Sequence, residues 1–141
     1  MVFLSKMSKF FVDTSYVLAL SFSSDRAHRK AASLAVALDR KRVQLVTTRA
    51  VLLEIGNALS KQRYRRYAVE FLSSIEESAD VVSLTDDLYA RAFDLFRARS
   101  DKEWGLVDCV SCVVMREQNI TQVLTADRHF QQMGFRALML E

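Results

Sequence analysis

Four acidic residues lie at positions where carboxylates from distant parts of the chain can meet. Asp13 and Asp127 directly follow apolar runs that are typical of buried strands. Glu54 lies early in a helix expected after another strand, and Asp108 begins a helix that leads into the strand before Asp127. In a parallel sheet all four positions share the carboxyl edge. We therefore expect the four carboxylates to line one cleft.

Such a cluster is costly unless a cation neutralises it, because neighbouring carboxylates repel one another and raise each other's pKa. We expect ligands that are all oxygen, since neither His28 nor His129 stands in a metal-ligand spacing such as HxxxH. Oxygen ligands suit Mg²⁺ or Mn²⁺ better than Zn²⁺. Mg²⁺ keeps several water molecules, which leaves room for a phosphate group and a nucleophilic water.

Each acid also has a structural interpretation that the sequence leaves open. Asp13 and Asp127 can cap the helices that follow them, and Asp108 can favour a helix dipole. Glu54 can pair with Arg49 or Lys61 on the surface. Taken singly, these interpretations outweigh a catalytic one. Four acids at one shared edge favour a functional site.

The composition predicts one globular domain. The chain has 141 residues, of which half are hydrophobic and 26% are charged, so it is long enough to bury its own core. It has no proline and three glycines, and no linker or repeat interrupts it. We expect residues 1–141 to form a single domain, with residues 1–7 as a non-essential N-terminal extension.

Charge, cysteine content and hydropathy limit the partners and the compartment. A net charge of +3 permits a polyanionic partner without demanding one. Two cysteines do not make a disulfide framework, which favours a reducing compartment. No apolar run reaches the roughly 18–20 residues of a membrane span. Asp13 interrupts the one run that resembles a signal peptide. We expect a cytoplasmic protein with no membrane association.

Strands are expected to alternate with helices along the whole chain. The expected strands are 9–13, 43–46, 80–84, 120–124 and 135–140, and the expected helices are 16–21, 25–38, 49–60, 64–78, 86–96, 107–118 and a short one within 125–132. This alternation predicts an α/β fold: a three-layer α/β/α sandwich with a central parallel sheet of four to five strands.

The segments around the four acids form motifs in a fixed order. They read FVDTSYVLAL around Asp13, EIGNAL from Glu54, WGLVDCVSCVVM around Asp108 and LTADRHFQQMGF around Asp127. In these motifs, which span essentially the whole chain, the sequence resembles the PIN domain, particularly the small toxin ribonucleases called VapC. The resemblance implies a PIN-like fold and an endoribonuclease that depends on Mg²⁺ or Mn²⁺. It also implies products with a 5′ phosphate and a 3′ hydroxyl.

The resemblance assigns roles to individual residues. The residues that match the family's catalytic, metal-binding acids are Asp13, Glu54, Asp108 and Asp127. Thr14 and Asn57 match polar positions that often support these acids. Gly105 and Val107 depart from the pattern, because family members often carry Ser or Thr at one or both positions. This departure affects the tightness of metal binding more than the chemistry, since all four acids are present. Asp101 is predicted as a further supporting acid.

The resemblance also implies partners. A VapC-type toxin implies a small antitoxin protein, whose helix or extended tail covers an apolar groove and places a basic residue among the acids. Homodimerisation is typical of the family as well. The alternative from another class is a non-catalytic PIN-like module that binds RNA or a protein without cutting, and the intact acids speak against it.

A cluster of cations is a candidate RNA-binding surface. The candidate residues are Arg49, Lys61, Arg63, Arg65 and Arg66, and all but Arg49 lie where one expected helix ends and the next begins. The alternative is a solvated helix face, and the sequence favours neither.

Other residues that resemble known signatures are expected to be structural. Cys109 and Cys112 form a CxxC pair without the second pair that zinc would need, so we expect two buried core residues. His28 and His129 are expected on the surface or in turns. Trp104 is expected to anchor the turn before the helix that contains Asp108.

Overall fold

The computed structural model describes residues 7–141 and contains one parallel sheet. Its strands are β1 (Ser8–Val12), β2 (Val43–Thr48), β3 (Asp80–Val82), β4 (Gln122–Leu124) and β5 (Arg136–Ala137). They lie side by side in the order β3-β2-β1-β4-β5, and every neighbouring pair is parallel. The expected parallel sheet is confirmed.

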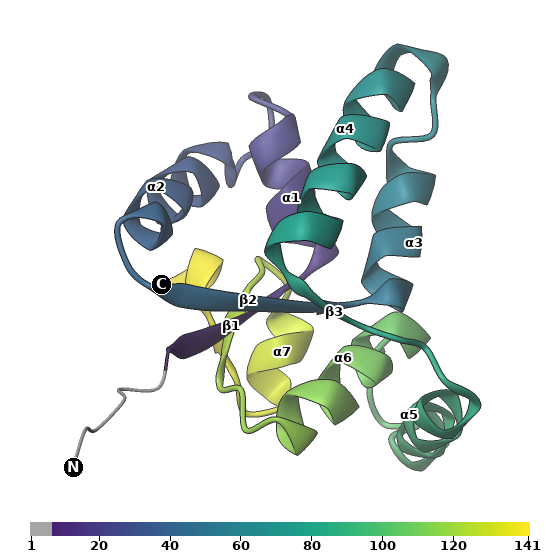
Figure 1. The fold of residues 1–141 in the computed structure, drawn as a ribbon. Coiled ribbons are helices and arrows are strands. Elements are labelled where there is room, and N and C mark those ends of the chain that lie inside the picture. Colours follow the sequence, from purple (N-terminus) through teal and green to yellow (C-terminus); the bar gives the residue numbers. More distant parts are fainter. Residues whose placement is uncertain (1–6) are drawn as a thin grey trace, which may run out of the picture.

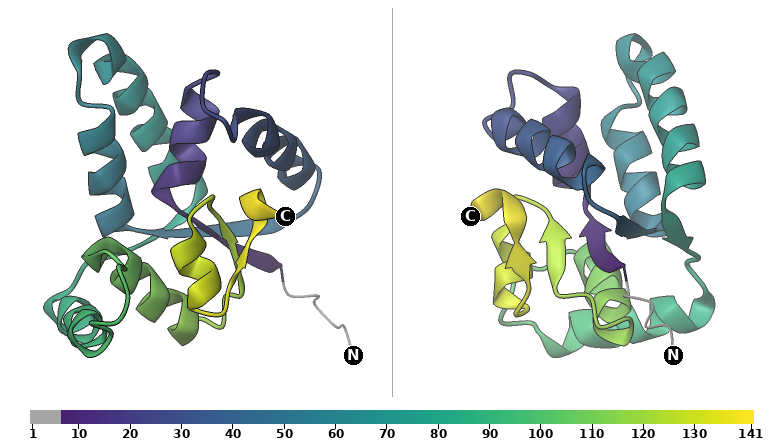
Figure 2. Two further views of the ribbon diagram at one scale, coloured as in Figure 1. Left: turned by 180° about the vertical axis from the view of Figure 1, so that it is seen from behind. Right: turned by 60° about the vertical axis from the view of Figure 1, so that its left-hand side comes forward.

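Helices connect successive strands and cover both faces of the sheet. They are α1 (Thr14–Ser21), α2 (His28–Asp39), α3 (Arg49–Ala58), α4 (Gln62–Ser78), α5 (Asp86–Ala98), α6 (Leu106–Glu117) and α7 (Arg128–Gln132). Helices α1 to α4 pack on one face and α5 to α7 on the other (Figures 1 and 2). The predicted three-layer sandwich is therefore confirmed.

Local sequence explains where these elements begin. The strand β1 is central in the sheet, so its apolar run Phe10–Val12 is buried against helices from both layers. Threonines begin two of the helices, because the hydroxyl groups of Thr48 and Thr85 accept hydrogen bonds from the backbone N–H groups of Val51 and Leu88, each at 3.1 Å. These caps fix the point at which each strand or loop gives way to a helix.

The strand order creates a switch point between β1 and β4. Successive connections run from β1 through β2 to β3 on one side, and the chain then returns to place β4 on the other side of β1. Phe11 pairs with Val123 and Val12 with Leu124 in this parallel register. Ligand sites in open α/β sheets form outside the carboxyl ends of the strands at such a point. The segments that follow Val12 and Leu124 contain Asp13 and Asp127.

Three strands are shorter than the sequence predicts. The fourth begins at Gln122 instead of residue 120. The third ends at Val82 instead of residue 84, and only Arg136–Ala137 of the expected strand 135–140 pair with β4. Leu138–Leu140 form a 3₁₀ turn, η1. Leu138 and Met139 are both 7% exposed, and two consecutive side chains cannot both point inward from a strand that is covered on one face only. The prediction was therefore wrong for residues 138–140.

The predicted N-terminal extension, residues 1–7, falls largely on residues 1–6, which lie outside the described part of the chain. Within residues 7–141, none of the helices is both long enough and apolar enough to span a membrane.

Candidate active site

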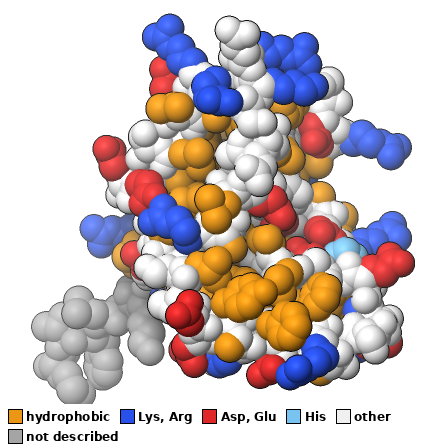
Figure 3. Space-filling model, turned by 90° about the vertical axis from the view of Figure 1, so that its right-hand side faces the viewer, with side chains coloured by type: hydrophobic (Ala, Val, Ile, Leu, Met, Phe, Trp, Pro, Cys, Tyr) orange, Lys and Arg blue, Asp and Glu red, His pale blue; other side chains and the backbone are white. Residues whose placement is uncertain are grey.

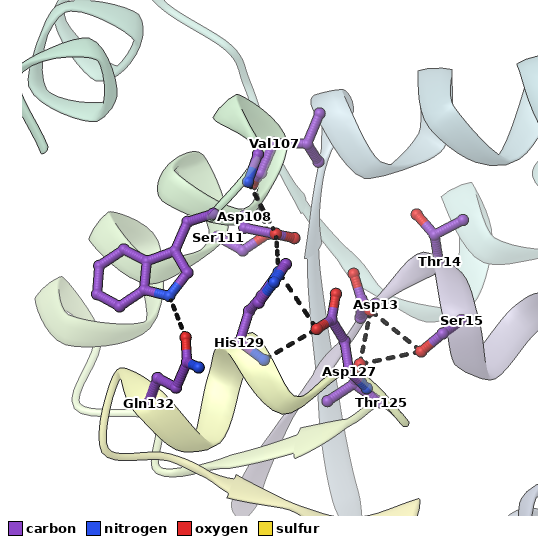
Figure 4. A network of polar contacts seen from close by, with 12 residues as sticks. Asp13, Thr14, Ser15, Val107, Asp108, Ser111, Thr125, Asp127, His129 and Gln132 are labelled. Atoms are coloured by element: carbon purple, nitrogen blue, oxygen red, sulfur yellow. Dashed lines mark hydrogen bonds and ion pairs between the residues drawn. The ribbon is translucent and has the colours of Figure 1, made fainter. Parts of the chain in front are cut away.

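Asp13 occupies the first residue after β1 and is 4% exposed. It stands at the N-cap position of α1, yet its side chain makes no capping hydrogen bond. Instead, its Oδ2 accepts hydrogen bonds from Thr125 Oγ1 at 2.7 Å and from Ser15 Oγ at 3.2 Å. The capping interpretation was therefore wrong for this residue. The carboxylate is held by hydroxyl groups that follow β1 and β4 (Figure 4).

The pKa of Asp13 is raised from 3.8 to about 6, mainly by burial, and the nearby carboxylates of Asp108 and Glu54 contribute to the rise. The hydrogen bond from Thr125 opposes this shift. An acid that is buried beside two other acids is costly to ionise. Its ionised form becomes favourable when a cation lies against it.

Glu54 faces the same edge from α3. Its Oε1 accepts a hydrogen bond from Thr14 Oγ1 at 2.5 Å, which joins the start of α1 to the middle of α3. Arg49, a candidate surface partner, forms an ion pair with Glu76 instead. Asn57 lies one turn after Glu54, and both line a cavity of about 270 Å³ between α3, α5 and α6. The predicted supporting residues Thr14 and Asn57 therefore both lie beside Glu54.

Asp108 and Asp127 meet at His129. His129 Nδ1 lies 3.1 Å from Asp108 Oδ2 and 3.3 Å from Asp127 Oδ1. One ligand atom from each of the three residues lies within 4.8 Å of the other two. Asp127 also caps α7, because its Oδ1 accepts a hydrogen bond from the backbone N–H of His129 at 2.9 Å. Asp127 therefore caps α7, as the structural interpretation predicts, and also lies near Asp108.

The pKa of Asp108 is raised, first by partial burial and then by the charge of Asp127, while the hydrogen bond with His129 lowers it. Asp108 Oδ2 also accepts a hydrogen bond from the backbone N–H of Gly105 at 3.1 Å. A Cβ at position 105 would lie 3.7 Å from Asp108 Oδ2, an ordinary contact. A hydroxyl residue would therefore fit there, whereas glycine offers Asp108 only its backbone N–H.

Val107 is the second residue that departs from the expected pattern. It lines the cavity beside Glu54 and Asn57. The nearby Ser111 does not replace the missing hydroxyl, because its Oγ donates to the backbone carbonyl of Val107 at 3.1 Å. Val107 therefore contributes an apolar side chain to the α6 side of the site.

Sequence reasoning missed three members of this site. His129 was expected on the surface or in a turn, and Thr125 and Ser15 were given no role in the site. Figure 4 shows all three pointing toward the acids. The available signal was that His129 lies two residues after Asp127, because the side chain of an N-cap residue accepts a hydrogen bond from the backbone N–H of the second helical residue. Thr125 carried no comparable signal.

Asp101 does not join the acids. It is exposed, and Arg99 donates two hydrogen bonds to its carboxylate, at 2.9 and 3.0 Å. This pairing lowers the pKa of Asp101 to about 2. The carboxylate is engaged on the surface, and a supporting role for Asp101 stays a prediction.

The candidate RNA-binding cations gather at the tip of the α3–α4 hairpin, which projects away from the sheet (Figure 1). All are exposed: Lys61, Arg63, Arg65 and Arg66. Arg65 donates to the carbonyl of Ser60, Arg66 pairs with Glu70 on the same helix, and Arg63 lies over the Tyr64 ring. Figure 3 shows this concentration of Lys and Arg at the end of the molecule. Arg49 lies apart from them at the start of α3.

The two cysteines and Trp104 are structural, as expected. Cys109 and Cys112 are free and buried, and burial raises the pKa of the Cys109 thiol to about 11, which leaves it unreactive at neutral pH. Trp104 is 4% exposed and donates to Gln132 Oε1 at 2.8 Å, so it anchors the start of α6 to α7. His28 Nδ1 lies 2.8 Å from the carbonyl of Ala19.

With the geometry established, comparison with known proteins places the chain in a family. The model of the PIN domain matches residues 10–136. The chain belongs to the PIN domain family. This PIN domain is 29% identical over 126 residues to the 23S rRNA-specific endonuclease VapC20 of Mycobacterium tuberculosis, with 89% of this chain and 94% of that protein covered.

Solved structures agree with this assignment. The crystal structure of M. tuberculosis VapC20, described as a sarcin-ricin loop cleaving toxin, matches this PIN domain with a TM-score of 0.80 at 29% identity, over 89% of this chain and 95% of that one. The structure of VapBC-1 from nontypeable Haemophilus influenzae matches with a TM-score of 0.65 at 10% identity, over 92% and 96% of the two chains. The second match supports the fold alone. The predicted resemblance to VapC-type PIN domains is confirmed.

Proposed function

We propose that this PIN domain is a metal-dependent endoribonuclease and the toxin of a toxin–antitoxin pair. The observation that carries the proposal is the gathering of carboxylates at the switch point between β1 and β4, where burial, together with the charges of Asp108 and Glu54, raises the pKa of Asp13 to about 6. A fold gains no stability by burying acids beside one another. Their convergence is explained when a divalent cation neutralises them.

The donor set fits such an ion. The proposed metal-binding acids are Asp13, Glu54, Asp108 and Asp127. Their carboxylate oxygens suit Mg²⁺ or Mn²⁺. When bound, such an ion lowers the pKa of a water molecule and stabilises negative charge on a phosphodiester during in-line attack.

The rest of the site orients these acids. Thr125 and Ser15 donate to one oxygen of Asp13, which leaves its other oxygen available to a ligand. Thr14 fixes Glu54 in the same way, and the Gly105 N–H fixes Asp108. Each carboxylate thus has at least one donor that sets its direction, and such donors make metal binding depend on the surrounding groups as well as on the ligands.

RNA is the proposed substrate. The relative VapC20 is named for cleavage of 23S rRNA and of its sarcin-ricin loop, which makes a structured ribosomal RNA loop the first substrate to test. The exposed cations of the α3–α4 tip, together with Arg49, are the proposed contacts to the phosphate backbone.

The cavity beside Glu54 is the proposed contact for the antitoxin. Its lining is mostly apolar and includes Leu53, which is 60% exposed, and Glu54 and Asn57 connect it to the acids. A peptide segment in this groove would cover apolar surface and place a basic side chain next to carboxylates. Leu53→Arg should prevent co-purification with the antitoxin, whereas Val69→Arg, an equally exposed position on α4, should not. Equal retention by both variants would exclude this groove.

A homodimer is proposed through the exposed face of α5. Tyr89, Phe93 and Phe96 are 46%, 41% and 44% exposed and stack along the helix. Figure 3 shows hydrophobic side chains gathered over this part of the molecule. Because the first turn of α5 is acidic and its last turn basic, two copies packed antiparallel would cover the aromatic row and match opposite charges. Sedimentation should show a dimer that Phe93→Ser dissociates, and a monomeric wild-type protein would contradict this.

The decisive experiment compares total cellular RNA treated with the wild-type protein and with Asp108→Asn, with Mg²⁺, with Mn²⁺ and with chelator, followed by mapping of the ends. We expect cleavage only with the wild-type protein and a metal, with 5′ phosphate and 3′ hydroxyl ends. Binding of RNA without metal-dependent cleavage, in a preparation free of antitoxin, would overturn the proposal in favour of a non-catalytic module.

A further inference from the structure

The neutralising cation proposed above was expected to have only oxygen ligands, but the structure places a nitrogen between two of the acids. His129 Nδ1 lies 3.1 Å from Asp108 Oδ2 and 3.3 Å from Asp127 Oδ1. All three side chains are partly buried, with 30%, 15% and 34% exposed for His129, Asp108 and Asp127. The nitrogen therefore faces the acids from the start of α7.

These separations suit a shared ion as well as hydrogen bonds. Ligand atoms about 2.1 Å from an octahedral ion lie about 3 Å apart when they are adjacent and about 4.2 Å apart when they are opposite. The two N···O distances match adjacent positions, and one donor atom from each residue lies within 4.8 Å of the others. The three residues can therefore bind one ion without rearrangement of the backbone.

The side chain can adopt the protonation state that coordination requires. A neutral imidazole binds a metal through one nitrogen and carries its proton on the other. With Nδ1 directed at the acids, that proton lies on Nε2, and the 30% exposure of the side chain allows water to accept its hydrogen bond. Coordination through Nδ1 therefore need not leave a buried donor unpaired.

We infer that His129 is a metal ligand, so that Asp108, Asp127 and His129 form a mixed nitrogen–oxygen site that prefers Mn²⁺ to Mg²⁺. The inference rests on the proposed function, because it concerns the cation of the same acidic site. Mg²⁺ is a hard ion that takes oxygen ligands, whereas an imidazole nitrogen suits divalent transition-metal ions. One nitrogen among the ligands thus shifts the preference of the site away from Mg²⁺.

The competing role for His129 is positioning, in which Nδ1–H donates to both carboxylates and never contacts the ion. The two roles differ in what the loss of His129 does. Loss of a positioning group weakens binding of both ions by a similar factor, about 10–100-fold. Loss of a nitrogen ligand weakens Mn²⁺ binding more than Mg²⁺ binding. His129→Asn separates them, because an amide can still donate to a carboxylate but does not coordinate through nitrogen.

The direct test uses electron spin echo envelope modulation of Mn²⁺ bound to the wild-type protein. We expect modulation from a directly bound imidazole nitrogen, which changes when the protein is labelled with ¹⁵N-histidine. The chain has two histidines, and His28 contacts the Ala19 carbonyl on another element, so the signal reports on His129. The signal should disappear in His129→Asn and persist in the matched control His28→Asn.

Calorimetric titration with Mn²⁺ and Mg²⁺ completes the test. The wild-type preference for Mn²⁺ should fall by about tenfold in His129→Asn and stay unchanged in His28→Asn. Mn²⁺ that binds in an Asp108-dependent manner, without nitrogen modulation, would overturn the role of His129 and leave the acidic site intact. Failure of Mn²⁺ to bind at all would overturn the proposed metal site together with this inference.

Discussion

Like charges gather at two regions of this molecule, and they are buried in one region and exposed in the other. At the carboxyl edge of the sheet, acids lie partly or fully buried, and burial and mutual repulsion raise the pKa values of Asp13 and Asp108. At the tip of the α3–α4 hairpin, cations are exposed and contact local partners such as Ser60 and Glu70. Exposed charges cost little and so reveal little about function, whereas buried like charges need an explanation.

Removing one buried acid tests this difference between buried and exposed charges most directly. Asp13→Asn should reduce metal-dependent RNA cleavage by about 10³-fold, because the variant keeps the shape of the side chain and loses its charge. End-labelled RNA in a single-turnover assay would measure this. The matched control is Asp94→Asn, which exchanges an exposed acid paired with Arg97 at 2.7 Å and should leave the rate unchanged. Equal activity of the two variants would remove the buried acid from the mechanism.

The pH dependence of stability tests the cost of ionising the buried acids. Because the pKa of Asp13 is raised from 3.8 to about 6, the folded state binds its proton more tightly than the unfolded state does. The free energy of unfolding of metal-free protein should therefore fall as pH rises from about 4 to about 6, by up to about 3 kcal/mol. The raised pKa of Asp108 acts in the same direction. Urea denaturation in chelator would measure this loss.

The control for that prediction is Asp13→Asn, in which the fall should be much smaller and stability at pH 7 should exceed that of the wild type. Saturating Mn²⁺ should restore the wild-type stability at neutral pH, since an ion bound to the folded state alone stabilises it. A metal-free wild-type protein that gains stability between pH 4 and pH 6 would contradict the assigned cause.

A smaller effect is expected from the hydroxyl that supports Asp13. Thr125→Val removes the 2.7 Å hydrogen bond to Asp13 Oδ2 while keeping the size of the side chain. It should destabilise metal-free protein by about 1–3 kcal/mol at pH 8, where the carboxylate is ionised, and by less at pH 4. Ser111→Ala removes another buried hydroxyl, bonded to a backbone carbonyl, and its cost should be the same at both pH values. A pH-independent loss in both variants would separate Thr125 from the acid.

The smallest effect on stability is expected at the hairpin tip. Reversing charge at Arg63 and Arg65 should change the free energy of unfolding by about 0.5 kcal/mol or less. If these residues bind RNA, the slope of log affinity against log salt should fall by about 1.4, or about 0.7 for each lost contact. Filter binding with a catalytically inactive variant would measure it. An unchanged slope, like that expected after reversal of the exposed Arg26 and Arg29 before and within α2, would exclude the tip from RNA binding.

Much of the fold was predictable because it depends on local patterns. The apolar run before Asp13 and the threonines before α3 and α5 identified the ends of elements, and the structure has strands and helices in the predicted order. The error at residues 138–140 arose because an apolar segment looks the same in sequence whether it continues a strand or turns across the sheet edge. Only the position of β5 at the edge decides between the two.

The acidic site was predictable only in part. The positions of the four acids followed from strand ends, and the structure brings Asp13 beside Asp108 and Glu54, and Asp108 beside Asp127. The partners of these acids did not follow. Thr125 donates to a residue 112 positions away, and nothing in either segment records that contact.

By itself, the sequence determined which elements form and which acids stand at their ends, because periodicity and capping act over a few neighbouring residues. Only the tertiary structure decided that β1 lies against β4, that hydroxyl groups hold Asp13, and that His129 faces Asp108. The order of strands and the directions of side chains depend on packing between distant segments, which no local pattern contains.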